Sequence, residues 1–499
     1  MTSPEQAYDT LVVGAGIAGL SAAALLARAG RSVLLLERAA RIGGVCQAVD
    51  TVAGRVELGG ALLTGSGPDG PLAHLCERLD IPLTTVPCEP ILQVATPRHR
   101  LSLFADPDRL WAEIRREFPP EEAGWRAFLF EMDVLAREQR NLTALLPPLP
   151  LVGMRARLAA WRVLGLGKLY GPRRQAIREV AQAERVPARA AMIRHGLGPE
   201  SQRILDALLW YLALRDADEC STLEAAVTLH ALREGSVTVR GGVAVLIEGL
   251  AARFQEAGGT LRLDTEVTGC LAERGRMVGV TTAAGETIRA RELLLTLSPE
   301  ALATRVLPPR GGWRFREPLL RGPWEADSVA AAAVVVVPER YVPAELCDRC
   351  LVVPAADRPV RAGGVAILRS LPDPEPSSGP TPDRRFTICR VGPAGPPSAA
   401  ADDEALLLAL LDQVLPGAAA VRVRSQSFGA AALAGLWGRP QAALRYSRVP
   451  PVWLGRRGFG RRLGWPGVRW IGEWTHPGRL VADVVEGATA AVDRSLEDG

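Results

Sequence analysis

A glycine-rich turn between two apolar segments near the N-terminus constrains the fold more than any other feature. Residues 9–13 are mostly apolar and predict a buried strand, and the glycine motif of residues 14–19 (G-x-G-x-x-G) follows directly. Residues 20–29 predict a helix, and residues 32–36 predict a second strand that ends at Glu37. Strand, turn, helix, strand and acid in this order are the fingerprint of a βαβ dinucleotide-binding unit.

Each part of this motif has a physical role. Gly14 permits the tight turn, Gly16 lets a diphosphate approach the backbone at the positive end of the helix, and Gly19 lets helix and strand pack closely. Glu37 is placed to accept hydrogen bonds from a ribose. Ala18, in the same turn, is a further predicted contact of the cofactor.

A second glycine pair indicates which dinucleotide is bound. Arg38 follows the acid, and the segment from Glu37 to Gly43 and Gly44 resembles the E-x-x-x-R-x-G-G continuation of flavoproteins with two dinucleotide-binding domains. Those proteins hold FAD, and the glycine pair lets the backbone pass close to the diphosphate and the isoalloxazine. The resemblance therefore implies FAD contacts at Arg38, Gly43 and Gly44.

A matching segment closes the chain. Residues 468–471 predict a strand, residues 472–478 a turn and residues 482–496 a helix. In the same flavoproteins a Gly-Asp pair contacts the ribitol, which implies this role for Gly472 and Glu473, with Glu in place of the usual Asp. The helix N-terminus at Val481 is expected to face the flavin pyrimidine and to stabilise negative charge there. Val267 is the predicted backbone contact of the adenine.

Length and composition limit the remaining possibilities. The 499 residues are enough for two interleaved domains, and the net charge of +4 comes without a basic tail, so no nucleic-acid partner is expected. The eight cysteines are scattered and predict neither a disulfide framework nor a metal site. No signal peptide and no run of 18 apolar residues is recognised, so a cytoplasmic location is expected.

We expect an α/β fold in which a Rossmann-like FAD domain is interleaved with an α+β substrate domain. The FAD domain is predicted to comprise residues 1–100, 236–300 and 441–499. Residues 101–235 are expected to form the helical part of the substrate domain, and residues 301–440 its sheet-containing part. The predicted helices are 110–118, 123–140, 154–166, 175–183, 201–214, 222–233, 243–257 and 403–415, and the predicted strands are 260–263, 276–280, 286–288, 293–297, 328–337, 365–371 and 385–391.

The stretch from Leu142 to Tyr170 has two readings. It combines apolar residues and Trp161 with basic residues such as Arg155 and Lys168. It is predicted either to dock peripherally on the inner face of a membrane or to pack on its own domain. The sequence leaves both alternatives open, and it leaves the oligomeric state open as well.

Taken together, the chain resembles the phytoene desaturase and carotenoid isomerase group of the FAD-dependent amine-oxidase superfamily. Four segments carry the resemblance: residues 14–44, 58–68, 239–259 and 475–478. After residue 478 the chain departs from the glycine-rich turn common in carotenoid desaturases.

The resemblance implies an FAD-dependent desaturase or dehydrogenase that abstracts a hydride from a lipophilic, isoprenoid or carotenoid-type substrate. If a base is needed, His476 and Glu473 are the candidates by position. Lys168 is the only lysine and does not match the lysine of the amine oxidases, which disfavours amine oxidation. A redox-neutral isomerase, a protoporphyrinogen oxidase-like enzyme, a natural-product flavin oxidase and a prenyl-protein binder of the GDP-dissociation-inhibitor type stay open as alternatives.

Overall fold

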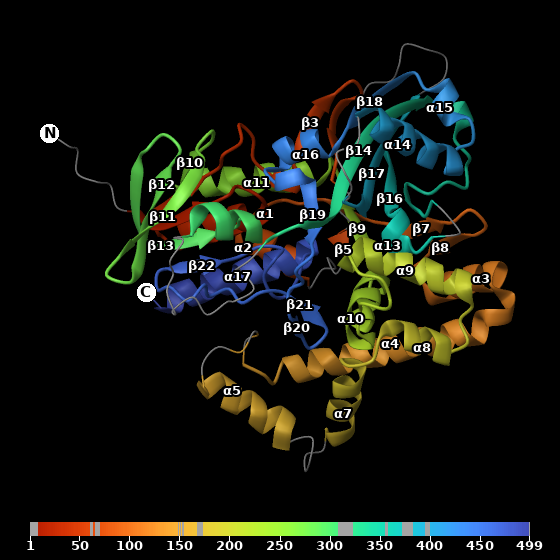
Figure 1. The fold of residues 1–499 in the computed structure, drawn as a ribbon, viewed down its shortest axis with the longest axis horizontal. Helices are drawn as coiled ribbons and strands as arrows, with labels where there is room; N and C mark the ends of the chain where they lie inside the picture. The colour runs from red at the N-terminus through yellow and green to blue at the C-terminus, as the bar shows by residue number, and fades with distance from the viewer. Residues whose placement is uncertain are drawn as a thin grey trace.

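The computed structural model of the protein contains two large sheets, with a helical region on one side of them (Figure 1). It describes residues 8–59, 63–64, 70–147, 149, 151, 154–166, 173–307, 323–354, 358–371, 383–394 and 400–498. Several predictions lie outside these residues, namely those at Gly60, residues 65–68, Lys168 and Tyr170.

The first sheet has seven strands and is built around the N-terminal βαβ unit. Its order is β10 (Thr260–Arg262), β2 (Val33–Leu36), β1 (Tyr8–Val13), β13 (Thr287–Leu295), β12 (Arg276–Thr282) and β11 (Val267–Glu273), and β22 (Val468–Trp470) also pairs with β13. The pairs β1–β2, β1–β13, β2–β10 and β13–β22 are parallel, whereas β11, β12 and the first half of β13 are antiparallel. The strands predicted at 286–288 and 293–297 are therefore parts of one long strand, β13.

Helices cover one face of this sheet. These are α1 (Ile17–Arg28), α11 (Val243–Glu256), α17 (Val481–Asp498) and α2 (Pro71–Arg78). Alternate residues of β1 point to opposite faces: Val12 packs among the helices, while Leu11 and Val13 pack with Trp470 on the other side. Both faces are buried, which explains why residues 11–13 of β1 and all of β2 are apolar.

The second sheet has eight strands, mostly antiparallel. Its order is β18 (Arg424–Phe428), β14 (Ala326–Pro338), β17 (Asp383–Pro393), β16 (Val365–Leu371), β15 (Arg349–Val352), β7 (Leu92–Ala95) and β8 (Arg100–Leu103), and β19 (Ala443–Tyr446) also pairs with β14. Because β7 pairs with β15, and β19 with β14, residues 92–103 and 443–446 belong to this sheet. The domain boundaries predicted at residues 100 and 441 therefore shift by several residues.

Residues 101–235 are mainly helical, as predicted. The helices are α3 (Pro107–Glu117), α4 (Glu122–Thr143), α5 (Met154–Trp161), α7 (Arg174–Ala183), α8 (Ala188–Arg194), α9 (Pro199–Ala213) and α10 (Thr222–Arg233). The predicted helix 154–166 is α5 followed by a π-helical turn over Arg162–Leu166, and α8 was not predicted. Between the second sheet's strands the chain also forms α14 (Ala400–Val414), of fifteen residues, and α16 (Ala430–Trp437), of eight residues.

Short elements connect the sheets. These are the hairpin of β3 (Ala48–Thr51) and β4 (Gly54–Glu57), the small sheet of β5 (Leu63–Thr64), β9 (Ser236–Val239) and β6 (Thr85–Pro87), the hairpin of β20 (Val452–Trp453) and β21 (Arg456–Arg457), and the 3₁₀ turn η1 (Gly44–Cys46). In the described part of the chain, no helix combines the length and the apolar character that crossing a membrane requires.

Candidate cofactor and substrate site

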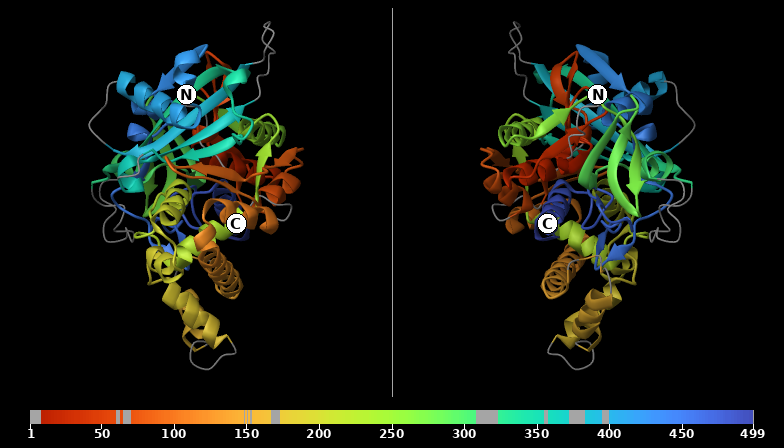
Figure 2. Two further views of the ribbon diagram at one scale, coloured as in Figure 1. Left: turned by 90° about the vertical axis from the view of Figure 1, so that its right-hand side faces the viewer. Right: turned by 90° about the vertical axis from the view of Figure 1, so that its left-hand side faces the viewer.

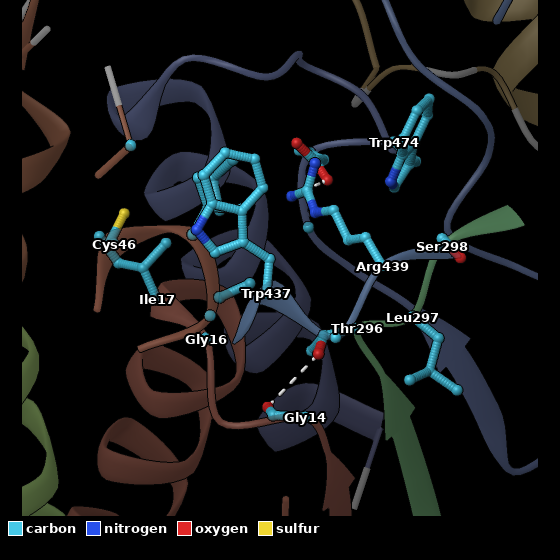
Figure 3. A pocket seen from close by; sticks show the side chains of 18 of the residues that line it. Gly14, Gly16, Ile17, Cys46, Thr296, Leu297, Ser298, Trp437, Arg439 and Trp474 are labelled. Atoms are coloured by element: carbon cyan, nitrogen blue, oxygen red, sulfur yellow. Dashed lines mark hydrogen bonds and ion pairs between the residues drawn. The ribbon is translucent and has the colours of Figure 1, made fainter. Parts of the chain in front are cut away.

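A cavity of about 320 Å³ lies where the carboxyl ends of the parallel strands of the first sheet approach the second sheet. One side is lined by the glycine motif, by Glu37 and by Gly43 and Gly44. The other side is lined by residues of the second sheet and of α9 and α16. Figure 3 shows the indole of Trp437 between Ile17 and Arg439, close above the glycine turn. Ligands of open α/β sheets bind at this end of the strands.

The three motif glycines occupy different environments. Gly14 has a φ of 101°, and a Cβ there would lie 2.2 Å from Thr296 Oγ1, whose hydroxyl donates to the Val13 carbonyl at 2.8 Å. A Cβ on Gly19 would lie 1.9 Å from the Gly14 carbonyl oxygen, so α1 can approach β1 only with glycine at this position. A Cβ on Gly16 would meet nothing within 4 Å. Gly16 thus leaves free space at the N-terminus of α1, on the cavity side, which suits a diphosphate.

The carboxylate of Glu37 organises the turn itself. Its two oxygens accept hydrogen bonds from the Ala15 amide at 2.7 Å and from the Ala39 amide at 2.9 Å. Each oxygen keeps a lone pair, so the predicted bond from a ribose is compatible with these contacts. Arg38, Ala18 and Val267 also line the cavity, Val267 at the start of β11.

The second glycine pair joins the cavity to α16. Gly43 has a φ of 110°, its amide donates to the Ala15 carbonyl at 2.8 Å, and Gly44 begins η1. The side-chain amide of Gln47 donates through Nε2 to the Gly44 carbonyl at 2.9 Å and also to the carbonyl of Leu436 in α16. Cys46 lines the cavity, and burial raises the pKa of its thiol to about 12, so the thiol stays protonated.

The C-terminal residues predicted to contact the flavin line the same cavity. Gly472 has a φ of 116° and lines the cavity together with Glu473 and Val481, the first residue of α17. The carboxylate of Glu473 forms an ion pair with Arg439, and both side chains are mostly buried. Glu473 is therefore held by a cation and is not a free base.

The structure argues against a catalytic role for His476. Its side chain is buried, and in the described part of the chain it lines neither of the two cavities and its Nε2 has no hydrogen-bond partner. Burial, with Arg456 and Arg461 nearby, lowers the pKa of His476 to about 3. The ring stays neutral and belongs to the wall of neither cavity, so it is not placed to act as a base on a ligand in them.

Apolar side chains of the substrate region complete the cavity, and none of them was predicted. Leu212 comes from α9, Ile367 from β16, Val391 from β17 and Leu444 from β19. Tyr211 lies beside Leu212, and burial raises the pKa of its phenol to about 12. No local motif marks these residues, because they meet only when the second sheet forms.

Comparison with known proteins is consistent with this geometry. Residues 17–338 match the family described as flavin containing amine oxidoreductase. The phytoene desaturase (neurosporene-forming) of Cereibacter sphaeroides is 25% identical over 302 residues, which cover 58% of this chain and 52% of that protein. The hydroxyneurosporene desaturase of Rubrivivax gelatinosus is 28% identical over 316 residues, covering 62% of this chain and 57% of that protein. The chain thus spans about half the length of the curated relatives it matches.

Among solved structures, an oxidoreductase from Methanosarcina mazei superposes with a TM-score of 0.61 at 16% identity, covering 97% of this chain and 99% of that one. At this identity the superposition establishes the fold. It confirms the predicted α/β fold over 97% of the chain.

Proposed function

Because the chain belongs to the flavin containing amine oxidoreductase family, we propose that it is an FAD-dependent oxidoreductase that abstracts a hydride from a lipophilic, isoprenoid-type substrate. One observation carries the proposal: a single cavity joins the dinucleotide fingerprint to an apolar lining from the second sheet. The names of the desaturases matched above suggest the substrate class.

The set of residues that line the cavity favours FAD over a mononucleotide. The wall includes Glu37 and Val267, the predicted contacts of the adenosine, and Gly472 and Val481, the predicted contacts of the flavin. Gly16, at the N-terminus of α1, lines the same cavity. A dinucleotide with an adenosine, a diphosphate and a flavin would use all of these contacts, whereas a mononucleotide would use only some of them.

The residues of the chain would position the reactants rather than exchange protons. When bound, FAD supplies the redox chemistry by accepting a hydride, and the second hydrogen leaves the neighbouring substrate carbon as a proton. The N-terminus of α17 would stabilise negative charge at the flavin end of the cavity. The Glu473–Arg439 pair would fix the wall beside it. A polyene spreads the positive charge of hydride loss, so this reaction does not require a strong base.

The apolar wall would hold the substrate and exclude water. Leu212, Ile367 and Val391 approach from three different elements. Removing apolar surface from water stabilises such a complex by about 25 cal/mol per Å². This lining accounts for a hydrocarbon substrate better than for a small polar amine.

We further propose that α5 makes the peripheral membrane contact. Met154, Leu158 and Trp161 are 80%, 47% and 57% exposed and recur at helical spacing along one face of α5. Arg155 and Arg162 are exposed beside them. Helix α5 lies at the end of the molecule away from the second sheet (Figure 2). Apolar residues flanked by arginines suit an anionic lipid surface.

Replacing Trp161 by Ser should weaken co-sedimentation with phosphatidylglycerol vesicles and leave the flavin content unchanged.

The proposed reaction can be tested with the flavin spectrum of the purified protein. Under anaerobic conditions, phytoene in liposomes should bleach the oxidised flavin band, whereas squalane, a saturated hydrocarbon, should not. An unchanged band with both would reject hydride abstraction from this substrate. Isomerised product without bleaching would favour the redox-neutral alternative. A protein that binds no flavin would favour the prenyl-protein binder.

A further inference from the structure

A second cavity, of about 140 Å³, adjoins the first and differs from it in its charge. The two share a wall that includes Leu214, Trp474, Glu473 and Arg479. Among the described residues that line the second cavity are six arginines (Arg215, Arg445, Arg448, Arg456, Arg457 and Arg479) and three carboxylates (Glu224, Glu473 and Asp483). The described lining of the second cavity therefore holds three more cationic than anionic side chains.

Each of the three carboxylates already has a cationic partner. Glu473 pairs with Arg439, and Glu224 accepts from Arg457 Nε at 2.6 Å. Asp483 accepts from the Leu480 amide at 3.3 Å and lies 3.7 Å from Arg456. None of these carboxylates is left over for a further arginine.

Arg445 and Arg456 also pair with carboxylates that do not line the second cavity. Arg445 contacts Glu219 through both terminal nitrogens at 2.7 Å and Asp327 through Nε at 2.7 Å. Arg456 lies 3.0 Å from Glu486. These arginines are structural, and their charges are balanced.

Arg215 and Arg479 differ from the others. Arg215 is only 7% exposed, its nearest carboxylate is Glu224 at 3.7 Å, already engaged by Arg457, and no hydrogen bond forms from it within the described chain. Arg479 donates to the Leu444 carbonyl at 3.2 Å and has no carboxylate partner among the described residues. Burial lowers the pKa of each guanidinium to about 10, so both remain charged at neutral pH.

We propose that Arg215 and Arg479 bind an anionic group, a carboxylate or a phosphate, at one end of the substrate. The apolar remainder would extend into the first cavity across the shared wall, so an isoprenoid with an anionic end would bind more tightly than a neutral one of the same length. Guanidinium groups match the geometry of both anions. Arg215, which shares Glu224 with Arg457, and Arg479, which has no carboxylate partner among the described residues, gain most from such a ligand. The placement of the apolar part rests on the proposed function, whereas the anion site does not.

Binding of three ligands with one isoprenoid chain tests the proposal: farnesol, farnesoate and farnesyl phosphate. Equilibrium dialysis of the whole protein measures each affinity without requiring turnover. We expect at least one anion to bind tenfold or more tightly than the alcohol, a difference of about 1.4 kcal/mol. Arg479→Gln should reduce this preference to less than threefold. Arg215→Gln should do the same, and Arg479→Gln suffices if the more buried variant does not fold.

Arg55→Gln is the matched control, because it removes an exposed arginine that pairs with Glu248 on the surface. It should keep the full preference. Equal affinity for alcohol and anions, a preference that survives Arg479→Gln, or no binding of any ligand would overturn the proposal. Loss of flavin or of flavin bleaching with the preference intact would instead reject the proposed redox function and leave the anion site standing.

Discussion

Substitution of Gly16 by Ala should weaken flavin binding while leaving the fold intact. A Cβ at this position would meet no protein atom within 4 Å, because it would enter the space on the cavity side of α1. In the free protein the change is mild, since Gly16 is the N-cap of α1 with a φ of −75°, which any residue can adopt. Alanine is a poorer N-cap than glycine, by up to about 1 kcal/mol.

The added methyl group should instead destabilise the complex of the protein with FAD. A methyl group inserted against a closely packed partner costs about 1–3 kcal/mol. Since about 1.4 kcal/mol corresponds to a tenfold change in affinity, we expect flavin to bind about 5-fold to 150-fold more weakly. Titration of the apoprotein with FAD, followed by flavin fluorescence, measures this directly, and thermal unfolding of the apoprotein reports on the fold.

Two other glycines of the same unit provide the controls. A Cβ on Gly19 would lie 1.9 Å from the Gly14 carbonyl oxygen, so Gly19→Ala should destabilise the apoprotein itself. Gly30 has a φ of 82° and free space around it, so Gly30→Ala should cost about 1–2 kcal/mol of stability without changing the affinity for FAD. Unchanged FAD affinity in Gly16→Ala would refute the placement of the diphosphate at this turn.

Three more predictions concern ionisable groups. Glu473→Gln leaves the mostly buried Arg439 without its anion and should destabilise the protein by about 3 kcal/mol in denaturant unfolding, an effect that a second change, Arg439→Gln, should partly reverse. Hydrogen bonds to Asp133 and Glu234 raise the pKa of His230 from 6.5 to about 9, so its protonation stabilises the fold below pH 6.5 and this contribution disappears as the pH rises through 9. Unfolding free energy should fall by at most about 2 kcal/mol from pH 7 to pH 9, and His230→Gln should abolish that fall. Cys46, with a pKa of about 12, should resist iodoacetamide at pH 8 in native protein and react only after denaturation, as mass spectrometry would show.

The cofactor-binding half of the fold could be predicted because its signals are local. A tight turn needs glycine at position 14, and close packing of helix on strand needs it at position 19. The observed β1, α1 and β2 follow the predicted bounds within a few residues, and the family match confirms the predicted resemblance. Long apolar runs such as β14 were predictable for the same reason, since both faces of that strand are buried.

The substrate half was predicted less well because its contacts are non-local. Strand β7 lies near residue 92, yet its partner β15 begins at Arg349, and no spacing in the sequence indicates that pairing. The wall of the cavity has the same origin: Leu212 and Val391 are ordinary apolar residues until the second sheet brings them together. Position in sequence likewise suggested His476 as a base, whereas its side chain is buried and lines neither of the two cavities.

The charged side chains at the wall between the two cavities affect one another, and no single sequence motif shows this. Glu473 belongs to a segment expected to contact the cofactor, and its carboxylate is paired with Arg439. Because of this pairing, Arg479, which lines both cavities, has no carboxylate partner among the described residues. A Glu473→Gln variant would therefore remove a negative charge facing Arg479 as well. If the second cavity binds an anion, this variant should bind farnesoate more tightly than wild-type protein does, even though it is less stable. Stability and anion affinity should thus change in opposite directions, which a purely structural role for the ion pair would not produce.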